Sequence, residues 1–219
     1  MTVALDVLPF LYSITLGMII VNWGITTFRG HNRELLTISS AMMCAGIAAM
    51  ATVDQNTPAK AIGLSFLGGL GTGGILQPAA TILTIVSPDE AIATITAATV
   101  SIRLVGASIG YAIYFNVLQN KVAAVLPINV ATAAAKAGIA PDKIPQFMGA
   151  FLGGNTTALA GYSLAVIGAA TEAVKSSYVE GFRLVYLVSI AFGGSAVIAC
   201  LFLGDIRRFM VDRVAVDIH

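Results

Sequence analysis

The residue with the clearest chemistry is Arg103, a single cation inside an apolar stretch that covers residues 91–118 and holds no other charged side chain. A charge at bilayer depth costs about 3 kcal/mol on insertion scales, so such a residue faces a bundle interior, a pathway or a water-filled cavity. Two roles are open for Arg103. It lines a pathway, or it pairs with backbone carbonyls and fixes helix packing.

Helical spacing places hydroxyl groups and glycines on the same side of this stretch as Arg103. Steps of three and four residues return to one helix face, and this stripe holds Thr96, Thr99, Arg103, Gly106, Gly110 and Tyr114. Gly106 and Gly110 form a G-x-x-x-G pair, which lets another helix backbone approach closely in lipid. The pattern predicts that Arg103 points into protein. Tyr111 and Tyr114 lie near the expected outer end, where tyrosines act as interface anchors or as substrate contacts.

A second candidate region is the glycine-rich run at residues 68–78 (GGLGTGGILQP). It matches G-x-G-x-x-G, but a dinucleotide fingerprint requires a preceding strand in a βαβ unit, and this run lies within a membrane-length apolar stretch. We therefore expect Gly69 and Gly73 to serve close helix packing. Pro78 lacks an amide donor and makes the helix a candidate for bending. Gln77 is expected either to contact a substrate or to form an interhelical hydrogen bond.

The remaining reactive residues favour neither a catalytic nor a metal site. His31 lies in a charged loop and His219 is terminal, so neither is placed for a hydrolase triad or a metal site. Cys44 and Cys200 lie in apolar runs and are expected to be small buried hydrophobes. A formal net charge of +1 indicates no nucleic-acid surface. We expect no enzyme, no cofactor and no bound metal.

The elements that must position these residues are membrane helices. Hydrophobic residues make up 57% of the 219 and charged residues 11%, which is typical of an integral membrane protein. A span needs about 20 apolar residues. That test predicts an all-α bundle with about five transmembrane helices, at residues 7–28, 36–53, 61–86, 91–118 and 184–203. The bilayer is thus the first predicted partner.

Charge placement predicts the orientation. Arg29 and Arg33 lie between the first two spans and further arginines follow the last, so the positive-inside rule places both groups, and the tail at 205–219, in the cytoplasm. Residues 119–182 then form a long outer loop. The apolar part of this loop is expected to be an interfacial or re-entrant helix rather than a sixth span. Asn155 begins a glycosylation sequon if the loop is lumenal or extracellular.

Three runs carry a family resemblance: residues 101–116 (SIRLVGASIGYAIYFN), 182–194 (FRLVYLVSIAFGG) and 202–206 (FLGDI). They resemble the C-terminal half of fungal major facilitator superfamily transporters, in particular the trichothecene efflux pump group within the fourteen-span drug:proton antiporters. The resemblance covers essentially the whole chain. It implies two pseudo-symmetric helical halves around a central substrate cavity, of which residues 1–219 supply one C-terminal half-domain.

The expected function is therefore the C-terminal portion of a proton-coupled exporter of small organic toxins or drugs, with Arg103 and Gln77 facing the cavity. Its expected partners are lipid, the substrate, protons, and either the missing N-terminal half or another helical membrane protein. The expected location is the plasma membrane. A siderophore-iron transporter of the same group and a truncated, non-transporting membrane scaffold are the alternatives.

Overall fold

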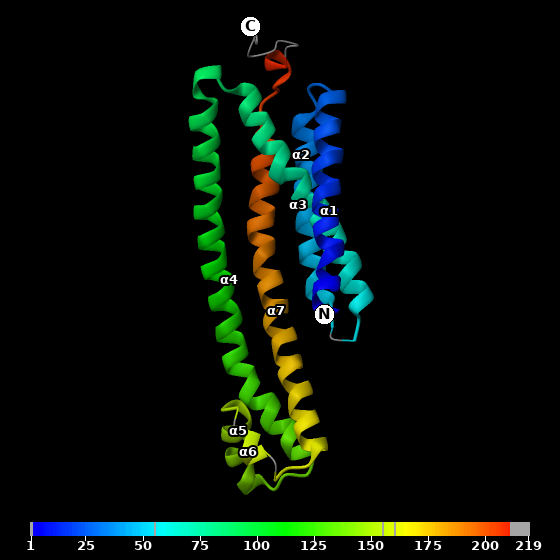
Figure 1. The fold of residues 1–219 in the computed structure, drawn as a ribbon, viewed down its shortest axis with the longest axis vertical. Coiled ribbons are helices and arrows are strands. Elements are labelled where there is room, and N and C mark those ends of the chain that lie inside the picture. Colours follow the sequence, from blue (N-terminus) through cyan, green and yellow to red (C-terminus); the bar gives the residue numbers. More distant parts are fainter. Residues whose placement is uncertain (1, 55, 155, 160, 211–219) are drawn as a thin grey trace. The chain divides into compact units, whose positions relative to one another are not determined.

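The computed structural model describes residues 2–54, 56–154, 156–159 and 161–210, and within them every regular element is helical. Figure 1 labels these helices along the chain. The α-helices are α1 (Thr2–Thr27), α2 (Asn32–Ala49), α3 (Pro58–Val86), α4 (Ile92–Lys136), α5 (Ile144–Leu152), α6 (Thr156–Leu159) and α7 (Leu164–Leu201). Short 3-10 turns occupy Met50–Thr52, Asp89–Ala91, Pro141–Lys143 and Arg207–Phe209.

Five of the described helices are long and apolar enough to cross a membrane, as the sequence predicts. They are α1, α2, α3, α4 and α7. The protein is accordingly an all-α integral membrane protein with several membrane-spanning helices.

Two of these helices, α4 and α7, extend far beyond the predicted spans. α4 continues through Pro127 to Lys136, and α7 begins at Leu164, so much of the expected outer loop at residues 119–182 is helix. Only α5 and α6 remain as short helices in the segment expected to be interfacial or re-entrant. At about 1.5 Å per residue, α5 reaches roughly 14 Å, which is too short for a sixth span.

Local capping explains where the long helices stop and start. Gly138 has φ +95°, a left-handed conformation that glycine adopts without penalty, and the amide of Ile139 donates to the carbonyl of Ala134 at 3.1 Å. At the start of α7, the Val166 amide donates to the Ser163 hydroxyl oxygen at 3.4 Å.

The chain divides into two compact units. Unit 1 holds α1, α2, α3, the first part of α4 through Tyr111, and α7 from Tyr186 onward with the segment that follows it. Unit 2 holds residues 53–56 and 112–185.

In unit 1, α3 packs against both α1 and α2. Small residues make the approach close. A Cβ on Gly73 would overlap the backbone of Ile14 in α1, and a Cβ on Gly71 would overlap the backbone of Met43 in α2. Glycine contacts of this kind let membrane helices reach backbone-to-backbone distance.

At one end of unit 1, the turn between α1 and α2 is tied to the segment after α7. Asn32 is 1% exposed and donates from Nδ2 to the carbonyl oxygen of Gly204 at 3.0 Å. Ile206 is buried in a cluster with Ile25 and Leu36. The first residues of the expected cytoplasmic tail therefore lie on the helix ends, while residues 211–219 are outside the described part.

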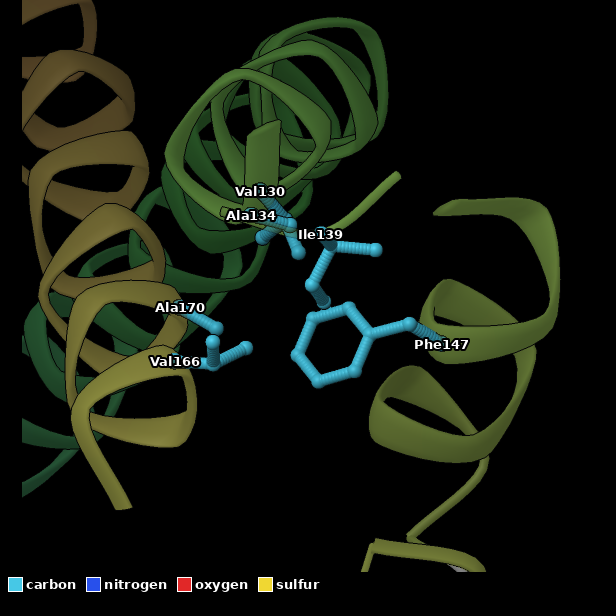
Figure 2. Packing of buried hydrophobic residues seen from close by; sticks show 6 residues of the cluster. All are labelled: Val130, Ala134, Ile139, Phe147, Val166 and Ala170. Carbon is cyan, nitrogen blue, oxygen red and sulfur yellow. The ribbon is translucent and has the colours of Figure 1, made fainter. Parts of the chain in front are cut away.

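Unit 2 has a hydrophobic core of its own. Phe147 of α5 is fully buried and points toward side chains of α4, α7 and the segment between α4 and α5 (Figure 2). The cluster consists of Val130, Ala134, Ile139, Phe147, Val166 and Ala170. Polar contacts join the same helices. Asn129 donates to the Ser177 hydroxyl at 3.0 Å, and the Lys121 ammonium lies 3.7 Å from the Glu180 carboxylate.

Candidate functional site

Arg103 lies half-buried on α4, beside a small cleft in unit 1. The cleft has a volume of about 30 Å³. Besides Arg103, α4 contributes Thr96, Thr99 and Val100, and α3 contributes Ala80, Leu83 and Thr84. The spacing on α4 predicts the first two neighbours, whereas α3 reaches the cleft only through the tertiary fold.

Three threonines line the same cleft as Arg103: Thr84, Thr96 and Thr99. The Thr99 hydroxyl donates to the Ile95 carbonyl at 2.8 Å, and the Thr84 hydroxyl donates to the Thr81 carbonyl at 2.8 Å. Their donors are thus used within their own helices, which leaves oxygen lone pairs available to accept hydrogen bonds. This lining is compatible with a cation, although no hydroxyl is bonded to it.

Among the described residues, Arg103 forms no hydrogen bond and no ion pair. The pairing of Arg103 with backbone carbonyls, considered from the sequence, is absent among the described residues. A guanidinium carries five donors and stays charged, so at membrane depth it requires acceptors from another source.

The cleft itself is too small for an organic ligand, because about 30 Å³ holds no more than about two water molecules. Any larger molecule would have to reach Arg103 from the open side of α4. There Gly106 is exposed, and a Cβ added to it would meet open space. The expected helix-to-helix contact at Gly106 is therefore not made within the described chain. Gly110 is half-buried.

Gln77 does not line the cleft. Its side chain is exposed on α3, three residues before Ala80, so it lies one helical turn from the cleft on the same face. Tyr111 is 70% exposed at the end of unit 1 and Tyr114 is half-buried in unit 2. Neither tyrosine lines the Arg103 cleft.

The glycines of α3 and Pro78 take structural positions. Gly69 lies against Ser13 and Phe10 of α1, and Gly73 lies against Ile14 of the same helix. Pro78 is buried, and α3 continues past it to Val86.

Asn155, the predicted glycosylation acceptor, is outside the described residues. Within the described residues, no group of three or more His, Cys, Asp or Glu side chains could hold a metal ion.

A second hollow, not predicted from the sequence, lies in unit 1 between α1, the end of α2 and the start of α3. Its volume is about 370 Å³, within the usual range of small-molecule pockets. It is lined by Val7, Phe10, Met50, Pro58, Ala61, Ile62 and Ser65. Ser65 donates its hydroxyl to the Ile62 carbonyl at 2.9 Å, so the pocket is almost wholly apolar.

Comparison with known families decides the affiliation of the chain. Residues 12–219 match the family described as the fungal trichothecene efflux pump. The chain belongs to this family. Within curated proteins, it is 32% identical over 112 residues to an MFS-type transporter, prx5, of Penicillium rubens, and 21% identical over 187 residues to the trichothecene efflux pump of Fusarium sporotrichioides.

The first alignment covers 51% of this trichothecene efflux pump family member, and the second covers 84% of it. They cover only 20% and 31% of the respective relatives. The chain thus spans less than a third of either relative's length. No solved structure matches the chain.

Proposed function

We propose that this chain is the C-terminal portion of a proton-coupled major facilitator exporter of small organic toxins, and that it acts in transport rather than catalysis. The observation that carries the proposal is the family match over residues 12–219. The five apolar helices support it, since a transporter must carry its substrate path through a helical bundle.

Arg103 is the residue we place on the substrate path. It is a permanent cation in an apolar helix, it has no partner among the described residues, and the helix face beside it at Gly106 is open. Its acceptors are then supplied by a substrate oxygen or by the rest of the transporter. Gln77, exposed one turn from the cleft, is the second polar residue we place toward the path.

We further propose that the C-terminus lies in the cytoplasm of a plasma-membrane protein and that residues 119–182 lie outside. The positive-inside rule supports this orientation, because Arg29, Arg33 and Arg207 lie at one end of unit 1.

The test of the Arg103 role is efflux of a tritium-labelled trichothecene from fungal cells that carry the natural protein. A hydrogen bond to a charged group contributes about 1.5–3 kcal/mol, so Arg103→Ala should lower the efflux rate roughly 10- to 100-fold. Arg103→Lys keeps the charge but loses the planar donor fork, and should give an intermediate rate.

The matched control is Arg33→Ala, which removes an exposed arginine from α2 and should leave efflux unchanged. Equal efflux from Arg103→Ala and the wild type, at equal surface expression, would remove Arg103 from the path. No efflux from wild-type cells would contradict the proposed export. Efflux that persists after an ionophore collapses the proton gradient would contradict proton coupling.

A further inference from the structure

The segment that follows α7 is anchored to the start of α2 within unit 1. α7 ends at Leu201, and residues 202–210 continue the chain as an irregular stretch with one 3-10 turn. The carbonyl oxygen of Gly204 in this stretch accepts a hydrogen bond from Nδ2 of Asn32 at 3.0 Å, across 172 positions of sequence. We call residues 202–210 the α7 clasp.

A hydrophobic side chain supplies the second anchor of the α7 clasp. Ile206 is 5% exposed and packs in a cluster with Ile25 of α1, Leu36 of α2 and Ile82 of α3. One side chain thus joins the clasp to three helices at the same end of unit 1. Phe202, in the same segment, is 83% exposed and lies outside this cluster.

An arginine supplies the third anchor, over the turn that joins α1 to α2. A Cβ on Gly30 in this turn would overlap the guanidinium group of Arg207. Gly30 also has φ +97°, a left-handed conformation that favours glycine. The amide of Arg207 donates to the Asp205 carboxylate at 2.8 Å, which fixes the backbone that carries the guanidinium group.

The closed α7 clasp leaves one buried polar atom unsatisfied. Oδ1 of Asn32 is buried, and among the described residues it accepts no hydrogen bond. A buried acceptor without a donor opposes closure, and so does the chain entropy lost when an irregular segment is ordered. The hydrogen bond to Gly204 and the burial of Ile206 favour closure by amounts of similar size. We therefore expect the open and closed states to be close in free energy.

Opening the clasp would leave the other helix contacts of unit 1 in place. α3 approaches α2 through Gly71, where a Cβ would overlap the backbone of Met43, and no clasp residue takes part in that contact. α7 meets α2 at Gly193, where a Cβ would overlap the Cys44 thiol. Gly193 lies about 12 Å along α7 from Leu201, so the end of α7 has a lever beyond this contact.

We propose that the α7 clasp opens and closes during transport. Closed, it ties the end of α7 to the turn between α1 and α2; open, it lets that end pivot about the contact at Gly193. The proposal rests on the proposed transport function and goes beyond it, because it names an element that moves within unit 1 and the residues that hold it, Asn32 and Ile206.

The decisive experiment locks the clasp in the natural protein. Asn32→Cys is combined with Gly204→Cys, since a side chain added at position 204 meets nothing within 4 Å. The purified protein in proteoliposomes is treated with a short, membrane-permeant bismaleimide, and transport of the tritium-labelled trichothecene is measured. Cross-linking should lower the initial transport rate at least roughly tenfold, because a conformational step is then blocked.

Each single-cysteine variant, treated with the same reagent, is the control and should keep its untreated rate. An unchanged rate in the fully cross-linked double variant would overturn the proposal, because the clasp would then stay closed throughout transport. Absent transport by the untreated wild type would instead contradict the proposed function.

Hydrogen–deuterium exchange tests the clasp without transport. Ile206→Ala removes the buried anchor and should speed exchange of the amides at 207–210 roughly threefold to tenfold, because a clasp that already opens has little protection to lose. Phe202→Ala, which truncates an exposed side chain of the same segment, should leave this exchange unchanged.

Two results of this measurement would contradict a reversible clasp, whatever the transport assay shows. Unaltered exchange in Ile206→Ala would mean that Ile206 does not anchor the segment. Acceleration of roughly 100-fold or more would identify the segment as a permanent part of the fold.

Discussion

Gly73 of α3 shows how strongly a single missing side chain can determine helix packing. A methyl group at its Cα would overlap the carbonyl group of Ile14 in α1, whereas a methyl group at Gly63 of the same helix would meet nothing within 4 Å. Both are glycines of one apolar helix. Only their neighbours in space distinguish them.

We predict opposite outcomes for alanine at these two positions. Overpacking a tight contact costs about 1–3 kcal/mol, so Gly73→Ala should lower the melting temperature of the purified protein in detergent. Gly63→Ala should be neutral or slightly stabilising, because alanine favours a helix over glycine. Equal melting temperatures for Gly73→Ala and the wild type would contradict this prediction and show that α1 moves to make room for the added methyl group.

The sequence singles out Arg103 because it contains no other charge between residues 91 and 118. Helical spacing also indicates Thr96 and Thr99 as its neighbours, and both line its cleft. Thr84 is different. It comes from α3, and no local pattern relates it to Arg103.

Among the elements, α4 and α7 depart most from sequence-based expectation. Their predicted ends, near Leu118 and Leu184, correspond to the edge of apolar sequence, but charged residues such as Lys121 and Glu180 continue the helices. The length of an apolar stretch matches the thickness of the bilayer core, and a helix can continue beyond that stretch. Gly138 and Ser163 were available as end signals, because each has the residue type of a helix cap.

Unit 2 should depend on Phe147 for its stability. The side chain is fully buried between α4, α5 and α7, and Phe→Ala substitutions in cores cost about 3–5 kcal/mol. We predict that Phe147→Ala speeds hydrogen–deuterium exchange of the α5 amides at least roughly 100-fold, since these amides exchange through local opening.

The control is Leu164→Ala, which truncates a side chain that is 87% exposed at the start of α7. It should leave α5 exchange unchanged. Unaltered exchange in Phe147→Ala would mean that the cluster in Figure 2 does not hold α5 in place.

At the scale of the whole molecule, the chain spans 20% and 31% of the two relatives' lengths. The open face of α4 at Gly106 leaves room for further helices beside this one.

For the whole molecule, we predict on which side of the membrane two positions lie. In a background without Cys44 and Cys200, a cysteine at Ile128 of unit 2 should react with a membrane-impermeant maleimide added outside intact cells, because Ile128 is 64% exposed. A cysteine at Arg33 should react only after permeabilisation. Outside labelling at position 33, or protection at 128, would reverse the proposed orientation.

The sequence alone determined that this protein is an all-α membrane protein with five apolar helices, and that Arg103 is its most unusual residue. These properties are local, since a helix satisfies its own backbone in lipid and a lone charge is conspicuous in any apolar run. The tertiary structure decided which glycines of α3 lie against a neighbouring helix backbone, and that Thr84 shares the Arg103 cleft. It also decided that residues 53–56 and 112–185 form one compact unit. Those properties depend on contacts between residues distant in the chain, which periodicity along one helix does not encode.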